Sequence, residues 1–357
     1  MKEKPFSDME KRKPLQLLLF EDIPAEDKKH SNTVALYDLM PKYVYKQTAL
    51  HRSISTDGKF SSYAPIERQF EYAGVLYDLK ITPARLEKEG KFIDFFPGER
   101  EEIVHMAILK IAIQKRRAQF VESKFMGVPF SFYELRKELA RIGKKYSLDE
   151  LKDAIRIMHH AGLEISADGV AMISSSLYPV MGIRQKQPDG TETTFVLFHP
   201  FLREAIEKME FRQIDYALNG SLKSYVSRWI HIKLTHQYRQ ASASPLVQPY
   251  NFSARSAIRD AGMPLKEFRF SVVRIRKALD ELKEKKIVSS YEEKPVYDVN
   301  DKRKILDVIF YVRVTTHFTD EQRRANAIHR DLEVRHHASK AKSQAPQLTS
   351  LGSRNRP

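Results

Sequence analysis

One order of predicted elements occurs twice in this sequence, and that repetition limits the possible folds more than any other feature. In the first copy, apolar spacing predicts three helices, within residues 99–120, 131–143 and 147–162. Apolar runs on either side of Asp168-Gly169 and of Asp189-Gly190 follow, and Asp-Gly between apolar runs is a strong β-hairpin signal. Three helices followed by hairpins are typical of a helix-turn-helix with a β wing.

The second copy begins with a long predicted helix in residues 221–238. Ser253 is placed to cap the next helix, Gly262 to end it and Pro264 to open the one after it. Two β runs around Asn300-Asp301 complete the unit. We therefore expect an α+β fold with two tandem winged-helix domains, each a helix-turn-helix plus a β-hairpin.

The 357 residues divide into five segments by composition and pattern. Both ends lack the sustained apolar periodicity that a core needs, so flexible tails are expected there. The predicted segments are a flexible N-terminal tail (1–45), a strand-rich lead-in (46–98), a first winged helix (99–215), a second winged helix (216–320) and a flexible C-terminal tail (321–357).

Composition favours a nucleic-acid binder and excludes several kinds of site. Lys and Arg total 61 against 46 Asp and Glu, a net charge of +15 that attracts polyanions. The chain has no Cys, which excludes disulfides, thiolate nucleophiles and Cys-ligated zinc. It also lacks a signal peptide and a long uncharged apolar run, so we expect a cytoplasmic protein.

No catalytic or cofactor motif is present. The Gly-Lys pairs lack both the upstream Gly and the following Ser or Thr of a phosphate-binding loop. His231 and His236 are five residues apart and His159-His160 are adjacent, so neither pair suits two metal ligands on one helical face. We expect a non-enzymatic binding protein without cofactor or metal.

Residues 265–282 form the predicted recognition helix, because one face is apolar and the other basic. The apolar side comprises Leu265, Phe268, Val272, Ile275, Leu279 and Leu282. Lys266, Phe270, Arg274 and Lys277 point away from it, with Arg269 at the margin. Such a basic face can reach guanine edges or phosphates in the major groove, or it can be an ordinary solvated surface.

Neighbouring cations favour the DNA-binding interpretation. The preceding helix carries Arg255 and Arg259, and the hairpin tip carries Lys302, Arg303 and Lys304. A basic helix beside a charged wing makes a consistent DNA footprint.

The corresponding helix of the first unit has the opposite balance. Asp149, Glu150 and Asp153 outnumber Lys152 and Arg156. We therefore expect the second unit to dominate affinity, while the first contacts backbone weakly or meets a protein partner.

Four stretches of the sequence together resemble a known family. They are residues 195–209 and 214–238, a strand, a short helix and then a Leu-Lys-Ser-Tyr helix, followed by residues 268–291 and 305–314. In this order they are similar to the iteron-binding, tandem winged-helix replication initiator (Rep) proteins of plasmids, of the TrfA type.

The resemblance implies that monomers bind origin repeats, open an A·T-rich stretch, and recruit the host initiator and replicative helicase. It also implies a monomer–dimer equilibrium with autoregulation by dimers.

A short apolar stretch near the N-terminus fits the same context. Gln16, Leu17, Leu19 and Phe20 match the Gln-Leu-x-Leu-Phe pattern of peptides that dock into the bacterial sliding clamp. The same peptide could instead bind single-stranded origin DNA, or these residues could pack locally on the first unit.

Two other functions use the same features differently. A winged-helix transcriptional repressor would use the basic helix but not the clamp-like peptide. A nicking initiator would need a metal-ligand pair beside a catalytic Tyr, and that pair is not found in the sequence.

Overall fold

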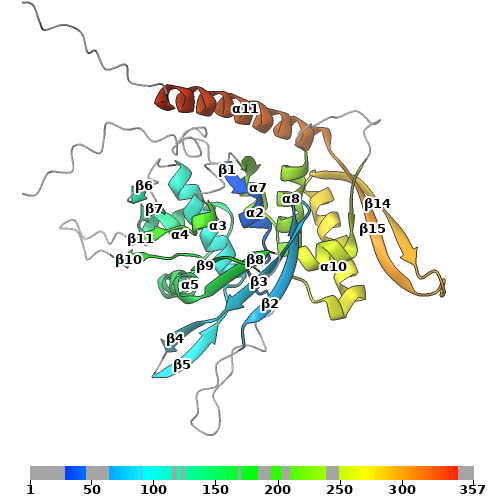
Figure 1. Cartoon of the computed structure of the whole chain (residues 1–357), viewed down its shortest axis with the longest axis horizontal. Coiled ribbons are helices and arrows are strands. Elements are labelled where there is room, and N and C mark those ends of the chain that lie inside the picture. The colour runs from blue at the N-terminus through cyan, green and yellow to red at the C-terminus, as the bar shows by residue number, and fades with distance from the viewer. Residues whose placement is uncertain are drawn as a thin grey trace, which may run out of the picture.

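The computed structural model describes residues 29–45, 64–88, 90–114, 119–121, 125–167, 170–183, 194–202, 210–238 and 249–344. In this part of the chain two winged-helix units lie side by side, and a long C-terminal helix crosses from the second unit back over the first (Figure 1). The predicted α+β fold with tandem winged-helix units is confirmed. The boundaries of the lead-in and of the two winged-helix segments remain predictions.

The first unit has its three helices and its wing in the predicted order. The helices are α3 (Glu99–Gln114), α4 (Phe132–Arg141) and α5 (Leu148–His160). The wing is the antiparallel hairpin of β8 (Gly162–Ala167) and β9 (Val170–Ser176).

Local signals explain where these elements begin. Ser147 and Glu150 form the predicted capping box at the start of α5, in which each side chain accepts the other residue's backbone N–H.

A second sheet of the first unit has the strand order β10-β11-β7-β6. Its strands are β6 (Gln119–Val121), β7 (Phe125–Phe130), β10 (Met181–Ile183) and β11 (Thr194–Leu197).

The lead-in contains four strands, as its alternating pattern predicted. These are β2 (Ile66–Tyr72), β3 (Val75–Thr82), β4 (Ala84–Lys88) and β5 (Lys91–Phe95). Strand β3 pairs with β8, so the first wing is extended into a four-stranded sheet, β2-β3-β8-β9. Strands β4 and β5 form a separate hairpin.

The predicted flexible N-terminal tail is wrong for its last part. Strand β1 (His30–Val34) pairs along its whole length with β12 (Phe211–Asp215), and α2 (Ala35–Leu39) follows it. All five residues of β1 are buried although most are polar. That polarity concealed the strand, because a buried strand normally shows an apolar run. A short helix, α7 (Tyr216–Ser221), follows β12.

The second unit contains a long helix, a helix-turn-helix and a wing, as predicted. The three strands form one sheet in the order β13-β15-β14. Its elements are α8 (Tyr225–Gln237), β13 (Tyr250–Ser253), α9 (Ala254–Asp260), the 3-10 turn η3 (Leu265–Glu267), α10 (Phe268–Glu284), β14 (Val288–Tyr297) and β15 (Ile305–Val314).

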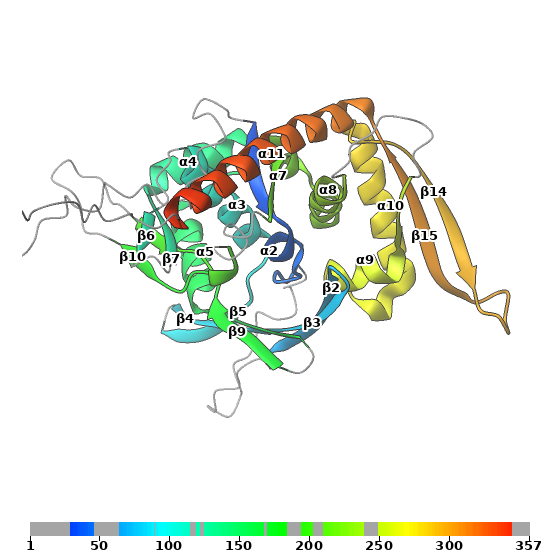
Figure 2. The same ribbon diagram turned by 45° about the horizontal axis from the view of Figure 1, so that its top comes forward.

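The predicted flexible C-terminal tail is also wrong over much of its length, since α11 spans Thr316–Gln344. Phe318, Gln322, Ala325, His329 and Leu332 recur at helical spacing and are buried. Leu332 joins the core of the first unit, whereas Phe318 belongs to the core of the second. Helix α11 therefore bridges the two units (Figure 2). Polar Gln322 and His329 within the buried stripe concealed the pattern.

The two units have separate hydrophobic cores joined by a buried ion pair. Arg228 of α8 is 0% exposed and its Nη2 lies 2.7 Å from Glu102 and 2.9 Å from Glu99, both on α3. Burial alone would lower the pKa of Arg228, but the Glu102 carboxylate outweighs this and raises it. Separating the fully buried guanidinium of Arg228 from its carboxylate partners would leave an unpaired buried charge, which is strongly destabilising. This contact therefore holds the two units in one relative position.

Candidate nucleic-acid interface

Helix α10 has the two faces that its sequence predicted. Val272, Ile275, Leu279 and Leu282 are buried in the core of the second unit. Gly262 precedes the helix at φ +66°, a conformation that favours glycine in the tight turn between α9 and α10. The turn and the buried stripe together hold the opposite face outward.

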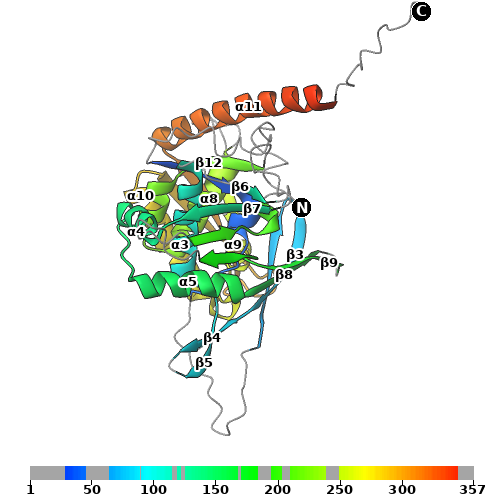
Figure 3. The ribbon, with the colours of Figure 1, turned by 90° about the vertical axis from the view of Figure 1, so that its left-hand side faces the viewer.

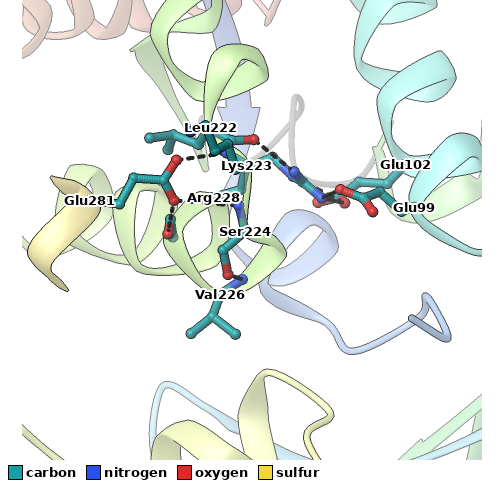
Figure 4. A network of polar contacts seen from close by, with 9 residues as sticks. Glu99, Glu102, Leu222, Lys223, Ser224, Val226, Arg228 and Glu281 are labelled. Carbon is teal, nitrogen blue, oxygen red and sulfur yellow. Dashed lines mark hydrogen bonds and ion pairs between the residues drawn. The ribbon is translucent and has the colours of Figure 1, made fainter. Parts of the chain in front are cut away.

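A polar network fixes the orientation of α10 against α8 (Figure 4). The Glu281 carboxylate accepts the backbone N–H of Lys223 at 2.7 Å and the Ser227 hydroxyl at 2.6 Å, at the N-terminus of α8. A carboxylate at a helix N-terminus is stabilised by the helix dipole. On the far side of α8, Arg228 continues the connection to α3, so α10 has a defined position relative to the first unit.

The outward face of α10, together with η3 before it, is basic and carries apolar side chains among its cations. Lys266, Arg269 and Lys277 are exposed, and within the described residues they form no ion pair. Phe270 lies among them and is 70% exposed. Val273 is also exposed on this face, and sequence reasoning missed it. Cations can reach phosphates or base edges, and apolar groups can contact thymine methyls.

Two further arginines of α10 are engaged in ion pairs. Arg274 lies 3.3 Å from Glu267 and is half-buried, so it is less free than the sequence suggested. Arg276 donates to both carboxylate oxygens of Glu293 on β14, at 2.8 to 3.0 Å. This pair, which the sequence analysis did not include, holds the wing beside the helix.

The two arginines of α9 are placed differently from one another. Arg255 is exposed, lies over the ring of Phe268 at 5.1 Å and donates to the carbonyl oxygen of Leu306. Arg259 is half-buried and pairs with Asp260 at 2.8 Å and with Glu71 of β2 at 3.0 Å. Arg259 therefore joins the lead-in sheet to α9, and its charge is largely compensated.

The wing tip presents three consecutive cations. Lys302, Arg303 and Lys304 are exposed in the turn between β14 and β15. Lys304 lies 3.2 Å from Asp298, whereas Lys302 and Arg303 form no ion pair within the described residues. The elements that carry the predicted cations, α10 and the β14–β15 hairpin, lie beside each other in the second unit (Figure 2).

The corresponding helix of the first unit is partly covered. Ile157 and Ala161 of α5 pack against Ala84 and Leu86 of the β4–β5 hairpin in a small cluster of their own. Lys88 of this hairpin forms an ion pair with Asp153. The exposed surface of α5 includes the acidic Asp149 and Glu150 and the basic Arg156. This surface therefore has no net positive charge.

A cleft of about 850 Å³ separates the first wing from the α9–α10 turn. Its charged lining residues are Glu67, Asp78 and Glu164 against Arg68, Lys80 and Arg259. These charges balance, so the cleft does not extend the basic surface towards the first unit.

The clamp-like peptide, Gln16, Leu17, Leu19 and Phe20, lies outside the described residues. Within the described part of the chain, no cluster of three metal-ligating side chains is found. No helix there combines the length and apolarity that crossing a bilayer requires.

No protein-family model and no curated protein matches this sequence. Among solved structures, the chain is similar to a selenomethionine derivative of domains 2 and 3 of RctB, at 11% identity and a TM-score of 0.42, covering 71% of this chain and 92% of that one. A second structure of RctB domains 2–3 matches at 9% identity and 0.39, covering 72% and 94%. The Pi initiator protein in complex with iteron DNA matches at 16% identity and 0.40, covering 61% and 91%.

Proposed function

We propose that this protein binds double-stranded DNA at repeated origin sites and initiates replication there. The observation that carries the proposal is the outward face of η3 and α10. There Lys266 of η3 and Arg269 and Lys277 of α10 are exposed without ion-pair partners among the described residues. In this arrangement α10 enters the major groove, Arg269 reads a base edge, and the wing cations contact phosphates. Arg255, Arg274 and Phe270 complete the contact surface at its margins.

The resemblance of the sequence to plasmid initiators supports the replication role over simple repression. Under this proposal the protein performs no covalent chemistry, acts in the cytoplasm, and works through partners. The partners are the host initiator, the replicative helicase and the sliding clamp. The clamp binds the peptide that contains Gln16, Leu17, Leu19 and Phe20. Single-stranded origin DNA is the alternative ligand of this peptide. A monomer–dimer equilibrium would then control copy number and autoregulation.

DNA binding is tested with a duplex enriched by the full chain from a random-sequence pool. Fluorescence anisotropy should show that Arg269→Ala weakens binding by about 1–3 kcal/mol and relaxes specificity at one position. The matched control is Arg136→Ala, which removes an exposed arginine from α4 of the first unit and should leave affinity unchanged. Equal losses in the two variants would contradict the proposed surface.

Replication is tested separately in cells. A plasmid that carries repeats of the enriched duplex beside an A·T-rich stretch, and no other origin, should be maintained only when this protein is supplied. Failure of maintenance together with tight binding would favour the repressor.

A further inference from the structure

The distal part of the second wing has an apolar surface that the core does not use. Val296, Tyr297 and Ile305 are each between 41% and 47% exposed near the end of the hairpin. Val299, in the turn, is 93% exposed, the largest value among the large hydrophobic residues that the structure describes as exposed. A β-branched apolar side chain held almost entirely in solvent at a projecting tip suggests a contact surface.

The tip that carries Val299 is internally ordered. The Asp298 carboxylate accepts the backbone N–H of Asn300 at 2.9 Å, and Asp301 accepts that of Arg303 at 2.9 Å. The Asn300 N–H and the Lys304 ammonium hold the pKa of Asp298 below its ordinary value, so the carboxylate stays charged at neutral pH. Both tip carboxylates are thus occupied, while Lys302 and Arg303 project.

The wing is also attached to α10 at its base. Arg276 pairs with Glu293, and the Tyr291 hydroxyl donates to Asp280 at 2.8 Å. A strand of ten residues such as β14 is roughly 33 Å long. Adjacent grooves of DNA are about half a helical turn apart, roughly 17 Å. The hairpin projects away from the rest of the second unit (Figure 2). With α10 in the major groove, a hairpin of this length is long enough to reach the neighbouring minor groove.

We propose that Val299 is an apolar wedge that enters this minor groove and partly unstacks one base step, with Lys302 and Arg303 holding the flanking phosphates. The inference rests on the proposed DNA binding and adds a contact that the basic residues alone do not provide. Apolar side chains inserted between base steps kink duplexes towards the major groove. Flexible pyrimidine–purine steps unstack most easily, so the wedge would also select sequence at a position without hydrogen bonds.

The test uses the enriched duplex with 2-aminopurine placed singly along its length. Binding of the full chain should raise 2-aminopurine fluorescence at one step about half a turn from the bases protected by α10. Circular-permutation electrophoresis should show a bend centred there. Val299→Ser should abolish the fluorescence rise and reduce the bend, while Val334→Ser, the same change at an exposed valine of α11, should alter neither.

The possible outcomes are distinguishable. If the chain binds the duplex but no position brightens, or if Val299→Ser behaves like the unchanged protein, the wedge is refuted and DNA binding stands. The tip would then be left free for a protein partner. If the chain enriches no duplex at all, the proposed function fails, and the wedge fails with it.

Discussion

Helices α5 and α10 occupy the same place in two copies of one motif, yet their outer surfaces differ in cover and in charge. On α10, Arg269 and Lys277 project beside a wing held by Arg276. On α5, Ile157 packs against the β4–β5 hairpin and Asp153 pairs with Lys88 of that hairpin. Figure 3 shows the hairpin beside α5. A winged-helix fold therefore does not by itself make a DNA-reading surface. Under the proposed function, the uncovered face and its charge determine which copy reads DNA.

The comparison also shows what the covered copy contributes. Helix α3 of the first unit supplies Glu99 and Glu102 to Arg228, and through α8 and Glu281 this contact reaches α10. We infer that the first unit serves as a support that fixes the orientation of the reading helix.

The largest expected effect comes from breaking this support. Arg228→Ala leaves the half-buried Glu102 without its guanidinium partner, and loss of one member of a buried pair costs about 3–5 kcal/mol of folding stability. Urea unfolding followed by circular dichroism reports both units, and fluorescence of the single tryptophan, Trp229, reports the second. We expect the two signals to coincide in the unchanged protein and to separate in Arg228→Ala.

The control for that experiment is Arg323→Ala. Arg323 pairs with Asp320 on α11, and both side chains are more than half exposed, so its loss should cost no more than about 1 kcal/mol. Coincident transitions in Arg228→Ala would mean that other contacts, among them α11 and the Arg259–Glu71 pair, are sufficient to couple the units.

Acid should destabilise the first unit more than the second. Burial lowers the pKa of His105 to about 3 and that of His199 to about 4, and in the second unit that of His231 to about 4, all from 6.5. Between the folded and unfolded pKa values the unfolded chain binds more protons, so stability falls as pH drops below 6.5. Each imidazole contributes up to about 1.4 kcal/mol for each pH unit.

This prediction is checked by urea unfolding at several pH values between 7 and 4.5, in the Arg228→Ala background if its transitions separate. As the pH falls, the midpoint of the first unit's transition, which Trp229 does not report, should move to lower urea concentration. This shift should be larger than that of the second unit's midpoint. A free energy of unfolding that stays constant between pH 7 and pH 5 would show that these histidines are protonated in the folded protein.

Sequence reasoning succeeded where structure follows from local spacing. Helical periodicity predicted both faces of α10, because apolar residues that recur at helical spacing lie on one side of a helix and become buried. The apolar face carries Val272, Ile275 and Leu279, and the basic face carries Arg269 and Lys277. The capping box at Ser147 and the hairpins are also local signals.

Sequence reasoning failed where contacts between distant segments determine the structure. The polar strand β1 is buried only because β12 pairs with it, about 180 residues further along the chain. The cover over α5 and the pairing of Arg259 with Glu71 likewise depend on contacts between distant segments. No spacing within either segment signals such a partner.

A smaller effect is expected at the wing, whose cations contact phosphates rather than bases under the proposed function. Arg303→Ala should weaken binding of the enriched duplex and of a scrambled duplex to the same extent, because phosphates carry no sequence information. The slope of log affinity against log salt should shrink by about 1. Anisotropy titrations at three or more salt concentrations measure both quantities. A loss confined to the enriched duplex would instead make Arg303 a base-reading residue.

The smallest effect is expected on α5, and it is the direct test of the comparison. Arg156 is an exposed arginine on a winged-helix recognition helix, as Arg269 is, but Asp149 and Glu150 share its surface and the β4–β5 hairpin covers the neighbouring face. Arg156→Ala should therefore change DNA affinity by less than about 0.5 kcal/mol, as surface substitutions away from an interface do. Side-by-side anisotropy titrations of Arg156→Ala and Arg269→Ala on the enriched duplex decide the point. If the two variants lose affinity equally, both copies of the motif read DNA, and the cover over α5 must open when DNA binds.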